Sequence, residues 1–142
     1  MYNLLDLYFN KKPVECEKEC IKCNKNTKHI KYTKLANILE ILILSIERIN
    51  FEENLKNYSN INYEEIINII DYVDKDIISI GNIYYKLFGI IIHYGNLNFG
   101  HYISVIKYYN NNWIEFNDDT VYIKENLYPE NKKAYSLFYE KI

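Results

Sequence analysis

The chain has 142 residues, a length that suits one domain with a sizeable core. Hydrophobic residue types make up 49% of the sequence and charged types 25%, which excludes a largely disordered chain. The net charge of −2 leaves no basic excess, so the sequence points neither to nucleic acid nor to an anionic membrane as a partner.

The amino-terminal part predicts one short helix followed by a cysteine-containing segment. Apolar residues between Leu4 and Tyr8 have helical spacing, and Lys11-Lys12-Pro13 ends the helix. The polar segment from Cys16 to Lys34 carries all three cysteines, Cys16, Cys20 and Cys23. An odd number of closely spaced cysteines is not typical of a secreted disulfide framework. We therefore expect a reduced, intracellular location, in the cytoplasm or the nucleus.

The longest apolar stretch lies in the middle of the chain. The segment Ile38–Ile49 is rich in Ile and Leu and predicts a strand buried on both faces. Its longest apolar part, Ile38–Ile46, is interrupted by Glu40 and is far shorter than the about 20 residues that cross a membrane, so no membrane segment is expected. The Asn-rich segment Phe51–Tyr63 predicts a loop, and the isoleucine spacing in Tyr63–Tyr72 predicts a helix.

The second half of the chain predicts consecutive strands because Tyr, Ile, Val and Phe dominate it. Turn residues separate these runs at intervals of about ten residues, including a turn at Asn110–Asn112, which predicts an antiparallel meander. With one or two short helices, the fold class is α+β. The predicted strands are Tyr84–His93, Tyr102–Tyr109, Trp113–Phe116, Val121–Ile123 and Ala134–Tyr139.

The residues that most clearly suggest a catalytic role are His101 and Asn117. If Tyr102–Tyr109 and Trp113–Phe116 form a hairpin, His101 enters one strand where Asn117 leaves its neighbour, so the two side chains lie close together. An oxygen that accepts the Nδ1–H of an imidazole leaves Nε2 free to take a proton from a nucleophile such as a thiol. The alternative from spacing alone is an ordinary hairpin with a half-buried histidine and an Asx turn.

Four blocks of sequence, in order and with natural spacing, resemble the histidine box of the ubiquitin-specific proteases, the papain-like cysteine deubiquitinases. More loosely, Ile38–Ile49 resembles a strand of that family and Cys20-x-x-Cys23 its second zinc knuckle. The resemblance implies a partial palm-and-fingers domain over residues 1–142, with a knuckle remnant in 1–35 and a palm-like sheet in 36–142. The four blocks are Tyr85–Gly95, Gly100-His101-Tyr102, Trp113–Val121 and Ala134–Tyr139.

The resemblance also implies roles for single residues. His101 matches the catalytic general base, Asn117 the residue that orients it, and Asp118 a neighbouring acid that supports the site. The segment from Gly95 to Gly100, followed by Tyr102, resembles a mobile loop that closes over the ubiquitin tail, although an ordinary hairpin loop is the simpler alternative. His93 is interpreted as a structural residue.

The chain contains no segment that resembles the family's amino-terminal cysteine box, which holds the nucleophile and the oxyanion-hole asparagine. Cys20 and Cys23 supply one Cys-x-x-Cys pair, whereas a tetrahedral thiolate site needs four ligands. We therefore favour free thiols over a structural zinc and expect no cofactor in catalysis.

Two functions remain open from the sequence, beside the plainer possibility of a degenerate fragment that does not fold well alone. The first is the carboxy-terminal part of a thiol deubiquitinase that hydrolyses the bond after the ubiquitin carboxyl-terminal glycine, with the cysteine on a separate amino-terminal lobe. The alternative is a catalytically inactive module that binds ubiquitin or ubiquitinated proteins, or serves as a scaffold. The resemblance places the chain among the hydrolases, but activity of the chain alone is not expected.

Overall fold

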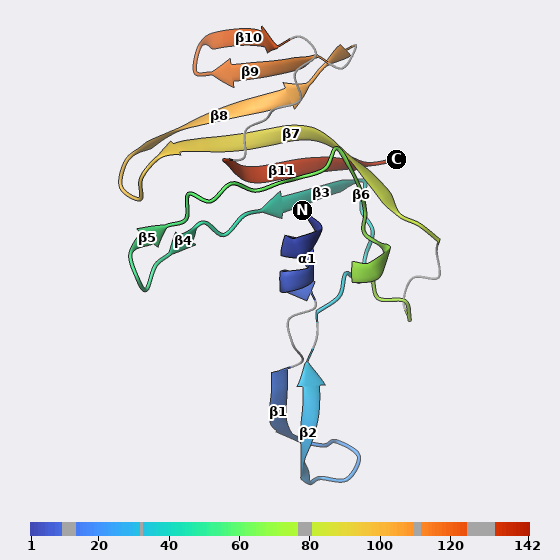
Figure 1. Ribbon diagram of the computed structural model, residues 1–142. Coiled ribbons are helices and arrows are strands. Elements are labelled where there is room, and N and C mark those ends of the chain that lie inside the picture. Colours follow the sequence, from blue (N-terminus) through green and yellow to red (C-terminus); the bar gives the residue numbers. More distant parts are fainter. Residues whose placement is uncertain (10–13, 32, 77–80, 110–111, 125–132) are drawn as a thin grey trace. The chain divides into compact units, whose positions relative to one another are not determined.

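A computed structural model describes residues 1–9, 14–31, 33–76, 81–109, 112–124 and 133–142 of the chain (Figure 1). The described residues form two compact units. The first consists of Met1–Ile38 and Ile69–Asn82, and the second of Leu39–Asn68 and Ile83–Ile142. None of the helices in the described ranges is long and apolar enough to cross a membrane.

The first unit contains one helix and one small hairpin. Helix α1 spans Tyr2–Phe9, as the sequence predicted, and strands β1 (Val14–Glu19) and β2 (Asn26–Lys31) pair antiparallel. The ring of Phe9 packs on that of Tyr72 at a centroid distance of 5.2 Å, next to the 3-10 helix η1 of Ile70–Tyr72. The hydroxyl of Tyr72 donates a hydrogen bond to Asp6, which ties η1 to α1.

The sequence placed a boundary between residues 35 and 36, whereas the contacts place it after Ile38 and add residues 69–82 to the first unit. The reason is a bridge between Leu35 and Val73. The Leu35 amide donates to the carbonyl of Tyr72, and the amide of Asp74 donates to the carbonyl of Leu35. These backbone hydrogen bonds join segments far apart in the sequence, so composition alone gives no sign of them.

The second unit is built on an antiparallel sheet in the strand order β10-β9-β8-β7-β11-β3, with β6 pairing the beginning of β7 (Figure 1). A separate two-stranded hairpin joins β4 and β5. The strands are β3 (Ile41–Ser45), β4 (Ile49–Asn50), β5 (Leu55–Lys56), β6 (Ile66–Asn68), β7 (Tyr84–Gly95), β8 (Gly100–Lys107), β9 (Trp113–Asn117), β10 (Thr120–Lys124) and β11 (Ala134–Lys141).

Successive side chains of each strand point to opposite faces of the sheet, so the buried residues collect on one face. The central strands contribute the most deeply buried members of the core. Two aromatic residues on this face keep their hydroxyls satisfied: Tyr139 donates to the carbonyl of Glu64, and Tyr85 to that of Leu39. Buried aliphatic members include Leu87, Ile90, Ile92, Ile103, Val105 and Leu137.

The prediction of an α+β fold dominated by antiparallel strands is confirmed, but the expected meander is only partly correct. Strands β7 to β10 do follow one another as neighbours. Strand β11, however, lies between β7 and β3 and pairs with both. The end of the chain therefore returns to the interior of the sheet instead of extending its edge. The predicted turn at Asn110–Asn112 includes residues 110–111, which lie outside the described residues.

The predicted strand at Ile38–Ile49, buried on both faces, is wrong in length and in burial. Strand β3 covers only Ile41–Ser45 and forms one edge of the sheet. Its outward residues Ile41 and Ile43 are 46% and 55% exposed. A continuous apolar run cannot show whether one face of a strand has a covering layer, because both cases give the same sequence pattern.

The expectations for residues 51–72 also need correction. The predicted loop Phe51–Tyr63 contains β5, which closes a hairpin on β4. The helix predicted for Tyr63–Tyr72 is instead strand β6 followed by the single turn of η1. Strand β6 pairs with Tyr84–Lys86 of β7, and this ladder outweighs the weak helical spacing of the isoleucines.

Candidate functional site

The candidate site lies at one end of strands β8 and β9. His101 is the second residue of β8, and Asn117 is the last residue of β9. The pairing of Ser104 with Phe116 sets the register that brings both side chains to one face of the sheet. The Nε2 atom of His101 lies 2.6 Å from Oδ1 of Asn117, a short hydrogen bond. The sequence therefore predicted this pair correctly.

The structure reverses the two imidazole nitrogens relative to the sequence expectation, in which Nδ1 was bonded and Nε2 was free. Here Nε2–H of His101 donates to the amide oxygen of Asn117. The proton on Nε2 leaves Nδ1 as the nitrogen with an available lone pair. Spacing brings two residues together but does not determine the rotation of a ring, which explains the error.

Asp118 makes a weaker approach to the same imidazole. Its Oδ2 lies 3.8 Å from Nε2 of His101, and its side chain is 76% exposed, against 43% for His101. An ion pair with this exposure contributes little because water screens it. Asp118 also has a backbone φ of 52°, so it makes the turn from β9 into β10. Asn117 is therefore the main orienting residue.

The two glycines of the predicted loop face each other across the β7–β8 hairpin, where Gly95 pairs with Gly100. Gly95 has a φ of +118°, and a Cβ there would lie 2.3 Å from the carbonyl oxygen of Phe99. Inside the loop, the side-chain oxygen of Asn96 accepts hydrogen bonds from the amides of Asn98 and Phe99. Both glycines are needed for this tight, internally bonded turn.

Tyr102 and His93 lie on the opposite face of the sheet from His101. They pair in register on β8 and β7, and their rings stack at a centroid distance of 4.3 Å. Tyr135 of β11 completes the cluster, with ring centroids 5.7 Å from His93 and 5.8 Å from Tyr102. Of the predicted site residues, the structure thus brings together His101, Asn117 and Asp118, whereas Tyr102 packs behind the sheet.

Lys56 and Arg48 belong to the same region and were not singled out from the sequence. Lys56 Nζ donates to Nδ1 of His93 at 2.6 Å and to the carbonyl of Gly95 at 2.8 Å. Burial, followed by the nearby charge of Lys56, lowers the pKa of His93. Lysine is so common in this sequence that no pattern distinguishes Lys56.

Arg48 is the sole arginine of the sequence and is 5% exposed. Its Nε donates to the carbonyl of Ala134 at 2.9 Å, and a second nitrogen donates to the carbonyls of Asn57 at 3.0 Å and Ser59 at 2.9 Å. Burial lowers the pKa of the guanidinium, which these oxygens stabilise. A single arginine at the end of an apolar run was the signal available in the sequence.

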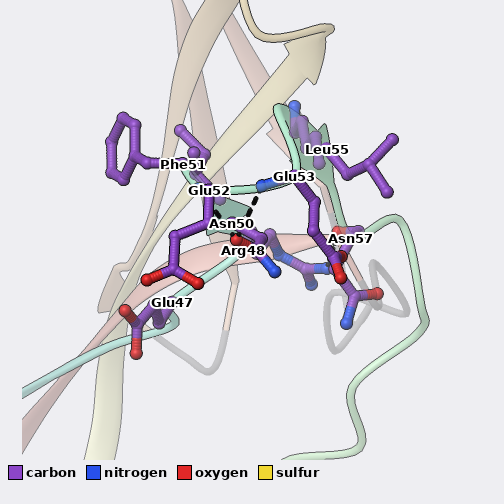
Figure 2. A pocket seen from close by; sticks show the side chains of 10 residues that line it. Glu47, Arg48, Asn50, Phe51, Glu52, Glu53, Leu55 and Asn57 are labelled. Atoms are coloured by element: carbon purple, nitrogen blue, oxygen red, sulfur yellow. Dashed lines mark hydrogen bonds between the residues drawn. The ribbon is translucent and has the colours of Figure 1, made fainter.

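An open pocket of about 710 Å³ lies against the β4–β5 hairpin (Figure 2). It combines acidic side chains, among them Glu52 and Glu53, with the strongly exposed Phe51 and Leu55, which are 84% and 59% exposed. The amides of Glu52 and Glu53 donate to the side-chain oxygen of Asn50, which shapes the turn. Its lining residues are Glu47, Arg48, Ile49, Asn50, Phe51, Glu52, Glu53, Leu55, Lys56 and Asn57.

Cys20 and Cys23 lie in the turn of the β1–β2 hairpin in the first unit. Backbone N–H groups of Lys22 and Cys23 point to the Cys20 sulfur and lower the pKa of its thiol. This turn could orient two thiolates toward a metal ion, but two donors are half of a tetrahedral set. The described part of the chain contains no cluster of three or more His, Cys, Asp or Glu side chains that could hold a metal ion.

The sequence of the chain is similar to those of known hydrolases over almost its whole length. Residues 11–139 match the family model described as "Ubiquitin carboxyl-terminal hydrolase". Ubiquitin carboxyl-terminal hydrolase 8 of Saccharomyces cerevisiae is 29% identical over 98% of this chain and 32% of the relative. Ubiquitin carboxyl-terminal hydrolase 4 of Arabidopsis thaliana is 29% identical over 75% of this chain and 29% of the relative. The chain spans about a third of the length of these curated relatives.

The fold of the chain is also similar to solved structures over its whole length. The chain is similar to a chain of the SAGA DUB module of Ubp8, Sgf11, Sus1 and Sgf73 bound to monoubiquitin, with a TM-score of 0.87 and 27% identity over 100% of this chain and 32% of that one. A second structure of this module gives a TM-score of 0.85. Together with the His101–Asn117 geometry, the match over residues 11–139 shows that this chain belongs to the ubiquitin carboxyl-terminal hydrolase family.

Proposed function

We propose that this chain supplies the histidine base and its orienting amide to a thiol deubiquitinase, which hydrolyses the bond after the carboxyl-terminal glycine of ubiquitin. The observation that carries the proposal is the 2.6 Å hydrogen bond between His101 and Asn117 at the ends of neighbouring strands. Membership of the hydrolase family supports the same substrate class. Ubiquitin and ubiquitinated proteins are the proposed partners, in an intracellular setting.

The geometry assigns each of the two residues a part in the reaction. A cysteine thiolate attacks the carbonyl carbon of the terminal glycine, after Nδ1 of His101 has accepted the thiol proton. The same nitrogen gives that proton to the amine as the carbon–nitrogen bond breaks. Water then attacks the acyl-thioester, loses a proton to Nδ1 and displaces the sulfur, which takes the proton back. Asn117 holds the Nε2–H throughout and so keeps Nδ1 directed toward the thiol.

We propose that the nucleophile lies outside this chain. Cys16, Cys20 and Cys23 do not lie in a segment that resembles the family's cysteine box. The chain also spans only about a third of the relatives that it matches. A separate lobe with the cysteine box would then meet the face that carries His101, and we propose that the Gly95–Gly100 loop contacts the ubiquitin tail. Tyr102, on the opposite face of the sheet, is not assigned to this contact.

The nucleotide sequence upstream of Met1 tests whether the same gene encodes a cysteine box. If it does, the longer product should cleave a fluorogenic amide of ubiquitin, and His101→Ala should lower kcat/KM by about 10²–10⁴-fold, the contribution of a general base. Asp119→Asn, in the same turn as Asp118, is the matched control and should retain activity. Unchanged activity in His101→Ala would contradict the proposed role.

A non-catalytic ubiquitin-binding or scaffold module is the second candidate, favoured by the lack of a recognisable cysteine box in these 142 residues. A ubiquitin probe with an electrophilic carboxyl terminus, applied to this chain alone, tests the premise that both candidates share, namely that the chain itself carries no nucleophile. Saturable binding of ubiquitin without covalent labelling fits both candidates, and the upstream sequence then decides between them. Labelling of Cys16, Cys20 or Cys23 would place the nucleophile within the chain and contradict both.

A further inference from the structure

Lys56 connects two hairpins that are far apart in the sequence. Its backbone lies on β5, in the pocket hairpin, and its ammonium group reaches His93 and Gly95 near the turn of the β7–β8 hairpin. Figure 1 labels β5, β7 and β8. There its Nζ donates to Nδ1 of His93 at 2.6 Å, to the carbonyl of Gly95 at 2.8 Å and, more weakly, to that of His93 at 3.5 Å. One ammonium group therefore holds both the backbone and a side chain where the loop begins.

The other edge of the His93 ring contacts the end of the same loop. A Cβ added to Gly100 would lie 2.0 Å from Nε2 and 2.6 Å from Cε1 of His93. The ring is also fixed on its faces and edges by Tyr102 and Tyr135. Because Lys56 donates to Nδ1, the neutral ring carries its proton on Nε2, beside Gly100. His93 is thus linked to Gly95 by way of the Lys56 ammonium and lies directly against Gly100.

The position of Lys56 is itself well supported. Lys56 pairs with Ile49 in the β4–β5 hairpin. Asn57, which follows Lys56 in the chain, exchanges two hydrogen bonds with Arg48. The Arg48 side chain donates to the Asn57 carbonyl, and the Asn57 amide donates to the Arg48 carbonyl. The ammonium lies 5.3 Å from the centroid of the Tyr58 ring. Burial, then the positive charges of Arg48 and Lys133, lower the pKa of Lys56.

We propose that Lys56 is a positioning residue, which through His93 and the Gly95 carbonyl fixes both ends of the Gly95–Gly100 loop and thereby the backbone that carries His101. His101 directly follows Gly100, so a shift of that glycine moves the base relative to Asn117. A movement of about 1 Å at a reacting group is enough to reduce catalysis strongly. The proposal deepens the proposed function because it concerns the same site, but it is tested without ubiquitin.

The test uses amide hydrogen exchange and imidazole ¹⁵N signals of the full chain in solution. In Lys56→Met, exchange of the Asn96 and Phe99 amides should become about tenfold faster, while that of Leu137 and Tyr139 in β11 stays within twofold. The His93 pKa should rise, since the variant removes both a neighbouring cation and the donor that favours the neutral ring. The titration therefore reports the contact between Lys56 and His93, and the amide exchange reports whether that contact holds the loop.

Lys34→Met is the matched control, because Lys34 also donates from an ammonium to a backbone carbonyl, that of Asp71 in the first unit. It should leave the loop amides and the His93 titration unchanged. Equal effects of both variants, or no effect of Lys56→Met, would overturn the proposal.

If Lys56→Met fails to fold, the unmodified chain provides the second measurement. Protonation of His93 removes the acceptor for Lys56, so the loop amides, corrected for intrinsic exchange, should lose protection with the His93 titration. Loop protection that does not change through that titration would also contradict the proposal. Unchanged activity of His101→Ala in the longer product would contradict the proposed function and would leave these readouts unaffected.

Discussion

The Nε2 atom of His101 lies 2.6 Å from Oδ1 of Asn117, although sixteen residues separate them in the chain. The hydrogen bond spans the ends of β8 and β9, so it depends on the register of that strand pair. A slip by one residue would turn one of the two side chains to the opposite face of the sheet. The register is held by the buried Trp113 and Val105, which fix which face points inward.

Removal of the Asn117 amide should release the imidazole of His101. In Asn117→Ala, the proton of the neutral ring should redistribute from Nε2 toward Nδ1, because a net hydrogen bond contributes about 0.5–1.5 kcal/mol and fixes the tautomer. The ¹⁵N chemical shifts of the ring measure the populations, and we expect a change of about three- to tenfold. Asp118→Asn is the control and should change them much less, because that carboxylate is exposed and 3.8 Å away.

Gly95 should be intolerant of any side chain. Gly95→Ala should lower the free energy of unfolding by about 1–3 kcal/mol, the range for a residue forced into a rare backbone conformation, because φ is +118° and the Phe99 carbonyl lies where the methyl group would be. Urea unfolding measures the difference. Gly81→Ala is the matched control, since nothing lies within 4 Å of the added Cβ there. Equal stability of both variants would show that the turn is not strained in this way.

Arg48 should be a major contributor to the stability of the second unit. Arg48→Met removes the donors to three carbonyls and should lower the free energy of unfolding by about 2–4 kcal/mol, because buried acceptors are left without partners. Chemical denaturation measures this loss. The exposed contact of Lys34 gives the comparison, and Lys34→Met should change the stability by less than about 0.5 kcal/mol. A cost for Arg48→Met no larger than this would mean that water replaces the guanidinium at those carbonyls.

His93 should make the stability dependent on pH. Burial and Lys56 lower the pKa of its imidazole in the folded chain, so the folded state favours the neutral ring. The stabilisation is complete above the unfolded value of about 6.5 and is lost as the pH falls through that value toward the folded pKa. The groups that face the ring are Lys56, Tyr102 and Tyr135, of which only Lys56 is charged at this pH.

Unfolding midpoints between pH 5 and pH 8 measure this dependence. His93→Phe keeps a ring beside Tyr102 but cannot titrate, so the slope below about pH 6.5 should become smaller. The same slope in the variant and in the original chain would assign the pH dependence to another group.

The sequence by itself determined the class of fold and the pair of residues at the centre of the site. Alternating apolar residues and Asn or Gly turns specified strands β7 to β10, because strand formation there depends on local propensity and pattern. The same spacing predicted that His101 and Asn117 meet, and the four blocks of the histidine box identified the family. These features are local, or cross only one hairpin.

Only the tertiary structure decided the features that join distant segments. It placed β11 between β7 and β3, made β3 an exposed edge and turned Tyr63–Tyr72 into β6 and η1. It also selected Nε2 as the bonded nitrogen of His101 and brought Lys56 to His93, 37 residues away. Strand order, ring rotation and long side-chain contacts depend on which surfaces pack together, and the sequence pattern of a single segment carries no record of its partner.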